Sequence, residues 1–332
     1  MSGEQKKIYI KAATQISLQQ PLSEEWMTAP LWHEEPYTRS IDPNFREWLN
    51  PLESRRMGKI LRRALVTAMK VMKDTGISQP DAIITGTGLG CIENTELFLD
   101  QLCREGEEML KPTYFMQSTH NTSSSLIAIQ GKCRGYNSTY SHKSVSFDSA
   151  LFDAFVQLRL GDIRNALVTG NDELTPSYFK ILQRTGFVGQ PGQVTAAESS
   201  VAMLLSQDAD DVLCEIADMR MCSGRFDAGQ LPEEADAVLL GVNGSEQNDA
   251  PYDAMMKQFP QVPLLRYKHL FGEGYTVSGL GIYAAAHLLK SGVVPAFMRC
   301  DGVEQPLSVD RLLMVNHSDG ENYSYVLMKR VK

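Results

Sequence analysis

The stretch YSHKSVSFDSALFDAF, residues 140–155, decides the fold. It predicts a short strand, a turn at Lys143 and Ser144, and the beginning of an amphipathic helix. Its apolar residues recur at offsets of three and four, as on a helix that packs one face on a core: Phe147, Ala150, Leu151, Ala154, Phe155 and Leu158. A turn between a strand and a buried helix is a common place for a nucleophile, because the helix N-terminus stabilises an anion such as a thiolate. Ser144 occupies this place, and a serine does not ionise there without a base.

Strands and helices alternate on both sides of this stretch. We expect helices over residues 51–74, 93–103 and 276–292, and a hairpin over residues 310–330. The other predicted strands cover residues 7–18, 81–86, 165–173, 198–206, 211–223 and 235–244. This alternation predicts a layered α/β fold. The Gly- and Pro-bearing connection at residues 172–197 contains the seam, so we divide the chain into halves at 1–190 and 191–332.

The composition limits the possible functions. The chain has 332 residues and a net charge of -8, which argues against a nucleic-acid-binding surface. Residues 52–63, LESRRMGKILRR, are the most basic segment; a solvated helix face is the simpler interpretation, and docking of an acidic carrier protein is the alternative. No apolar run has the length of a signal peptide or a membrane span, so we predict a cytoplasmic protein.

The cysteines follow no metal or disulfide pattern. Because they show neither CxxC spacing nor nearby histidines, we predict free thiols, no metal and no cofactor. The six are Cys91, Cys103, Cys133, Cys214, Cys222 and Cys300.

Two local patterns invite a catalytic or binding interpretation. TGTGLG, residues 85–90, follows a strand but lacks the third glycine and the later acidic residue of a dinucleotide site, so a tight turn before a packed helix is favoured. His142 lies two residues before Ser144 and would share its strand face as a base. We favour an incidental histidine, since the sequence identifies no third group to orient it. His33 and His317 are predicted in loops.

Several motifs together resemble the β-ketoacyl synthase family of the thiolase superfamily. In that family an Arg-Gly turn leads through a strand to the active-site cysteine, and a helix follows to a Gly-Asp. Here Arg134-Gly135 leads to Ser144, and the helix reaches Gly161-Asp162 before NALVTGNDE. KPTYFMQSTHNTSSSLIAI, residues 111–129, resembles the dimer-interface segment of the family, and YKHLFGEGYTVSGLG, residues 267–281, resembles its Lys and Gly-His stretch. The resemblance implies a thiolase-like fold of two pseudo-symmetric halves in α-β-α-β-α layers.

Carried over position by position, the resemblance implies a degenerate active site. The cysteine position holds Ser144, the first catalytic histidine falls on Asn243, the second on Glu273, and the lysine persists as Lys268. The glycine-rich gate of the family falls on NHSDGEN, residues 316–322. A serine lacks the low pKa of a thiol, and a carboxylate at position 273 repels an enolate unless it pairs with Lys268. We therefore expect a Glu273–Lys268 ion pair.

Three hypotheses follow from the resemblance. The first is a chain-length-factor type of subunit that pairs, through residues 117–129 and the adjoining strand, with an active β-ketoacyl-ACP synthase. It would act with an acyl carrier protein in type II fatty acid, polyketide or aryl-polyene-like biosynthesis. The second is an acyltransferase or hydrolase in which Ser144 accepts the acyl group and His142 or Glu273 is the base. The third is a homodimeric carrier-binding scaffold.

Overall fold

Ten strands form the framework of the protein. The computed structural model describes residues 6–108, 110–224, 235–257 and 261–332. In space the strands follow the order β10-β9-β13-β14-β8-β1-β7-β5-β3-β4. In chain order the first five are β1 (Ile8–Ile16), β3 (Ala82–Gly86), β4 (Tyr136–Tyr140), β5 (Asn165–Asp172) and β7 (Ser199–Ser206). The second five are β8 (Cys214–Ser223), β9 (Ala237–Leu240), β10 (Leu264–Arg266), β13 (Arg311–Ser318) and β14 (Asn322–Lys329).

The two sets of strands repeat one topology. Each set places its strands in the order third, second, fourth, fifth, first. In each, the third, second and fourth strands are parallel, and the fifth and first pair antiparallel. The pseudo-symmetry that the sequence predicts is therefore confirmed. We call the two sets the first and the second sheet; in space they join where β1 pairs antiparallel with β8. Along the chain the first set ends with β7 and the second begins with β8, after the division at 190/191.

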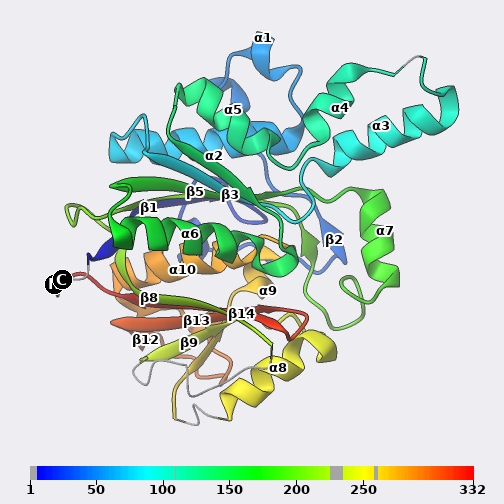
Figure 1. The fold of residues 1–332 in the computed structure, drawn as a ribbon. Helices are drawn as coiled ribbons and strands as arrows, with labels where there is room; N and C mark the ends of the chain where they lie inside the picture. The colour runs from blue at the N-terminus through cyan, green and yellow to red at the C-terminus, as the bar shows by residue number, and fades with distance from the viewer. Residues whose placement is uncertain (1–5, 109, 225–234, 258–260) are drawn as a thin grey trace.

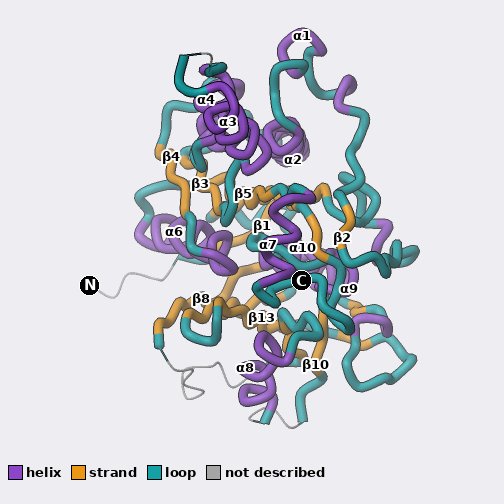
Figure 2. Tube along the Cα trace, turned by 90° about the vertical axis from the view of Figure 1, so that its right-hand side faces the viewer, coloured by secondary structure: helices purple, strands orange, loops and turns teal. Residues whose placement is uncertain are grey.

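Helices and sheets alternate in five layers (Figure 1). α2 (Lys59–Thr75) and α5 (Thr122–Gly131) cover the outer face of the first sheet, and α8 (Glu246–Met256) covers the second. α6 (Ser146–Leu160) and α10 (Ser278–Ser291) lie between the sheets, as Figure 2 shows from the side. The remaining elements are short or peripheral: α1 (Pro51–Ser54), α3 (Ile92–Glu105), α4 (Pro112–Ser118), α7 (Pro176–Arg184), α9 (Lys268–Phe271), β2 (Tyr37–Thr38), β6 (Ala196–Ala197), β11 (Val293–Val294), β12 (Leu307–Ser308) and the 3₁₀ turn η3 (Lys143–Val145).

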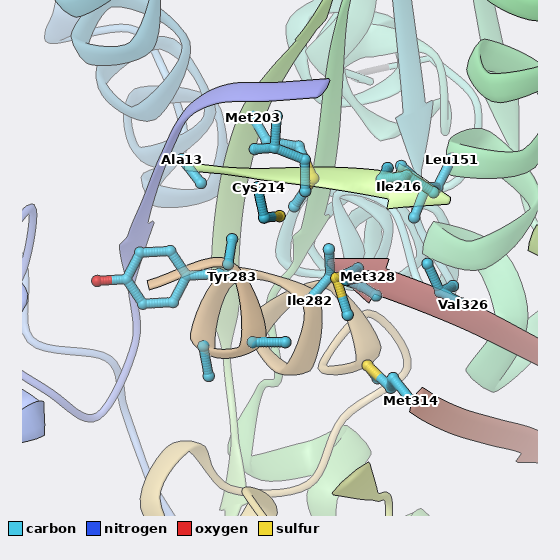
Figure 3. Close-up of a cluster of buried hydrophobic side chains, with 14 of the residues drawn as sticks. Ala13, Leu151, Met203, Cys214, Ile216, Ile282, Tyr283, Met314, Val326 and Met328 are labelled. Atoms are coloured by element: carbon cyan, nitrogen blue, oxygen red, sulfur yellow. The ribbon is translucent and has the colours of Figure 1, made fainter. Parts of the chain in front are cut away.

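The largest apolar cluster fills the space between the sheets. Figure 3 shows part of it: Leu151 of α6 and Ile282 and Tyr283 of α10 meet Met203 of β7, Ile216 of β8 and Met314 of β13. Separate clusters join α2 to the first sheet and α8 to the second. The helices α2 and α8 thus bury apolar side chains against one sheet each, and the central helices α6 and α10 are covered on two sides.

Two sequence expectations need correction. The helix predicted over 51–74 is broken into α1 and α2, because Gly58 is in an extended conformation immediately before α2. His317 was expected in a loop but lies inside β13, buried against Tyr252. The predicted strands and the C-terminal hairpin form as expected. Among the described residues, the helices are all too short or too polar to cross a membrane.

Candidate functional site

The Ser144 turn follows the third strand of the first set, as predicted. β4 ends at Tyr140, and η3 begins at Lys143, whose φ is +45°. The Ser146 hydroxyl fixes the turn, because it accepts a hydrogen bond from the His142 N–H (2.8 Å) and donates one to the Lys143 carbonyl (2.6 Å). Ser144 remains half-exposed at the start of α6.

Glycines let α6 approach the first sheet closely. A Cβ at Gly86 would lie 2.6 Å from the Phe147 backbone, and a Cβ at Gly88 would lie 2.3 Å from Tyr275. The turn that these glycines begin is held by the buried Asp172, whose carboxylate accepts hydrogen bonds from the Gly88 and Leu89 N–H groups. The TGTGLG segment is therefore a packed turn that receives a carboxylate of its own chain, as the sequence favours.

Asn243, Lys268 and Glu273, the residues onto which the resemblance carries the two histidines and the lysine of the family, meet in one buried cluster. Lys268 Nζ donates to Glu273 Oε2 at 2.7 Å, and Asn243 Nδ2 donates to the same oxygen at 2.6 Å. The other oxygen, Oε1, accepts from the Gly274 N–H at 3.0 Å. Both charged side chains are only 3% exposed. The predicted Glu273–Lys268 ion pair is confirmed, and both oxygens of the carboxylate are occupied.

Ser144 and Asn243 line a shared pocket of about 230 Å³ between the halves of the chain. Leu182, Thr185 and Phe187 contribute from the first half. The other lining residues include Ser245, Gln247, Asn248, Tyr275 and His317. The rings of Phe187 and Tyr275 stack with centroids 5.0 Å apart. Lys143 and Asp319, which form an ion pair with each other, are the charged residues of its lining. Glu273 and Lys268 do not line it.

The candidate base His142 lies outside this pocket. It lines a different cavity together with Tyr140, Phe152 and Asp153. The hydrogen bonds of the described residues include none between the side chains of His142 and Ser144, and the His142 contact to the turn is made by its backbone N–H. The structure therefore brings Ser144, Asn243, Lys268 and Glu273 into one region and leaves His142 beside it.

His317 is the histidine that does line the pocket. Its Nε2 lies 2.8 Å from the Asn248 carbonyl, and its Nδ1 accepts a hydrogen bond from the Gly320 N–H at 3.2 Å. This pattern fixes a neutral ring with the proton on Nε2. Burial lowers the pKa of His317 to about 4. With both nitrogens occupied, the ring is not placed to take a proton from Ser144.

Sequence reasoning missed Asp148 and Asn316, which lie directly behind Ser144. Asn316 Nδ2 donates to the Ser144 carbonyl at 2.9 Å and to Asp148 Oδ2 at 3.0 Å. Asp148 is fully buried, and desolvation raises the pKa of its carboxyl, opposed by hydrogen bonds from Ser324 and Asn316. The sequence could have indicated that Asp148 is buried, because it lies three residues before Leu151 on the apolar stripe of α6.

Comparison with known proteins agrees with this geometry. A model of the N-terminal domain of β-ketoacyl synthases matches residues 25–237. The chain belongs to the β-ketoacyl synthase family. Among curated proteins, none matches it.

Solved structures share the fold over their whole length. The ishigamide ketosynthase/chain length factor superposes with a TM-score of 0.81 at 15% identity, over 99% of this chain and 100% of that chain. The ketosynthase ApeO in complex with its chain length factor ApeC, from Xenorhabdus doucetiae, gives 0.78 at 14% identity, over 98% of each chain. AntDE:AntF, a type II polyketide acyl-carrier protein in complex with its ketosynthase, gives 0.79 at 11% identity, over 99% and 100%. At these identities the likeness establishes the thiolase-like fold.

Proposed function

We propose that this chain is a non-catalytic ketosynthase-like subunit, of the chain-length-factor type, that pairs with an active β-ketoacyl-ACP synthase. The main observation is that the Glu273 carboxylate is buried and fully paired. A condensing site needs groups that stabilise an enolate, and here the carboxylate is buried, paired with Lys268 and bonded to Asn243. Ser144 has no free base among the described groups of its pocket: His142 lies outside it, both His317 nitrogens are occupied, and the Asp319 carboxylate is paired with Lys143.

An open sheet edge supports pairing with another subunit. β4 is the last strand of the ladder, and its other side is unpaired within the described residues. A strand edge with free N–H and C=O groups is a template for adding a strand from another chain. Apolar side chains are exposed on the neighbouring α4 and α5: Phe115 is 58%, Met116 71% and Ile129 71% exposed. We assign this face, with residues 117–129, to the subunit interface.

The remaining parts of the proposal concern the pathway. An acyl carrier protein would deliver substrate to the pair, and a fatty acyl, polyketide or aryl-polyene-like chain would be the product. AntDE:AntF is a complex between a ketosynthase and its carrier protein, which supports this choice by likeness of fold. The described cysteines are all free thiols, consistent with the reducing cytoplasm in which we place the protein.

Co-expression with a cysteine-bearing ketosynthase, first the one encoded beside it, tests the proposal. We expect a stable heterodimer whose product-forming rate is unchanged by Ser144→Ala in this chain. The matched control replaces the active cysteine of the partner by Ala, which should abolish turnover. Loss of turnover in Ser144→Ala, with the heterodimer intact, would show that the serine does chemistry.

The enzyme and scaffold alternatives make different predictions. If Ser144 is an acyl acceptor, mass spectrometry of the isolated chain incubated with acyl-carrier substrates should find an acyl ester on Ser144. If the chain is a scaffold, a larger side chain at the interface should leave product length unchanged. Ile129→Trp is suitable because Ile129 is already exposed and the fold does not depend on its size. A shift in product length would support the chain-length-factor function.

A further inference from the structure

Buried polar contacts join the Ser144 turn to the β13–β14 hairpin. Asp148 accepts hydrogen bonds from Asn316 Nδ2 at 3.0 Å and from the Ser324 hydroxyl. Asn316 and Ser324 are direct cross-strand partners in the hairpin, so one carboxyl holds both strands. Since Asn316 also binds the Ser144 carbonyl at 2.9 Å, the turn and the hairpin are fixed to each other through Asp148.

The tip of the hairpin is held by a second set of contacts. Lys143 Nζ, from the Ser144 turn, pairs with Asp319 Oδ2 at 2.6 Å. His317 binds the Asn248 carbonyl on one side and the Gly320 N–H on the other. The Tyr323 hydroxyl donates to the Gly320 carbonyl at 2.5 Å. Residues 316–320 are therefore held by contacts to the Ser144 turn through Lys143 and to the second half of the chain through Asn248.

The interior beneath Ser144 is filled. Phe147 is fully buried and lies so close to Gly86, Gly170 and Gly279 that a Cβ on any of them would be within 2.8 Å of it. Tyr252, also fully buried, directs its hydroxyl to Asn316 Oδ1 at 3.5 Å. The pocket is lined by Ser144 and His317, whereas Phe147, Asp148 and Asn316 do not line it. Ser144 therefore forms the floor, and Asn316 and Asp148 lie beneath it, outside the pocket.

We propose that Asp148, Asn316 and Ser324 form a clamp that closes the floor of the Ser144 pocket, so that the pocket admits small polar molecules and excludes acyl chains. A long apolar chain needs continuous apolar space, and a satisfied polar network in a close-packed interior supplies none. This inference deepens the proposed function: it gives a physical reason why this subunit holds no acyl chain of its own. It concerns the isolated chain, so it can fail while pairing with a ketosynthase succeeds.

A cysteine reporter at the pocket tests the clamp. In Ser144→Cys, the introduced thiolate displaces iodide from iodoacetamide or from N-dodecyl iodoacetamide, and peptide mass spectrometry measures each rate. The exposed Cys103 of the same molecule normalises both reagents. We expect iodoacetamide to label the introduced thiol, and the dodecyl reagent to label it at least about tenfold more slowly, because the filled interior beneath residue 144 leaves no space for the alkyl chain unless the clamp opens. Equal normalised rates for the two reagents would overturn the proposal.

Loosening the clamp provides the matched comparison. Both variants are made in the Ser144→Cys background. Asp148→Ala removes the carboxylate that accepts both hydrogen bonds of the clamp, whereas Ser324→Ala removes only one of the two donors. Both should increase dodecyl labelling of the introduced thiol relative to Cys103, with the larger increase in Asp148→Ala. Circular dichroism checks that each variant is folded. If Asp148→Ala does not fold, Ser324→Ala decides. A folded variant with unchanged dodecyl labelling would overturn the proposal.

Discussion

The two halves of the chain carry equivalent turns that differ in one property, burial. In the first half β4, the third strand of its set, leads through η3 to α6; in the second half β10, also a third strand, leads through α9 to α10. Each turn contributes a lysine to an ion pair of almost the same length. Lys143–Asp319 measures 2.6 Å and Lys268–Glu273 measures 2.7 Å. The first pair is 67% and 52% exposed, and the second is 3% and 3% exposed.

This difference separates a surface contact from a structural element of the core. Water and salt screen an exposed pair, whereas a buried pair has lost its hydration and depends on its partner and hydrogen bonds. Glu273 has these bonds from Asn243 and Gly274. The ion pair of the second-half turn is therefore part of the core, whereas Lys143 and Asp319 line the pocket. Three predictions test the contrast, from the largest expected effect to the smallest.

Removing the buried carboxylate should cause the largest effect. Glu273→Ala leaves the Lys268 ammonium buried without its partner, which typically costs about 3–5 kcal/mol of unfolding free energy. Urea unfolding followed by circular dichroism measures it. The matched control is the double variant Lys268→Met with Glu273→Leu, which removes both charges and should cost much less. A loss in Glu273→Ala below about 1 kcal/mol, the range of exposed pairs, would contradict the contrast.

A second effect should appear only at low pH. Burial lowers the pKa of His317 to about 4, below the value near 6.5 of an unfolded histidine. Between these values the unfolded chain binds a proton that the folded chain does not, so stability falls as pH falls from about 6.5 to about 4. We expect His317→Gln to remove about 2 kcal/mol of this loss.

Unfolding free energies at pH 7 and pH 4.5 measure the effect as a difference between the two pH values. This cancels the constant cost of losing the contacts of His317 to Asn248 and Gly320. His120→Gln, at an exposed position in the first half, is the control. If His317→Gln and the wild type lose the same stability between the two pH values, His317 is not held neutral by burial.

Much of the fold follows from local sequence patterns. The apolar stripe of α6 and the hairpin at residues 310–330 predict their elements correctly, because periodicity records which face is buried. The Glu273–Lys268 pair followed from the family resemblance, because a carboxylate at position 273 would repel an enolate unless it paired with Lys268. The break at residues 55–58 was missed because the apolar and helix-forming residues on both sides of it suggest one continuous helix.

The surroundings of Ser144 were less predictable. Asp148 is separated from Asn316 and Ser324 by 168 and 176 residues, and only the packing of α6 against β13 and β14 brings them together. Long-range polar contacts leave no periodic pattern. His317 shows the same limit: two residues before a turn, it looks like part of the loop, although the register of β13 with β14 places it opposite Tyr323. Contacts between residues that are close in the sequence could be predicted. The contacts of Asp148 with Asn316 and Ser324 could not, because they join distant parts of the chain.

The smallest effect should come from the exposed pair. Lys143→Ala removes the ammonium that binds Asp319, and we expect less than about 1 kcal/mol of lost unfolding free energy, because both side chains stay hydrated without each other. Raising the salt concentration should reduce even this difference, whereas the effect of Glu273→Ala should persist, since buried charges are little screened. Urea unfolding of both variants at low and high salt measures the contrast. A loss of several kcal/mol in Lys143→Ala would mean that the first-half turn belongs to the core as fully as the second, and that exposure does not distinguish them.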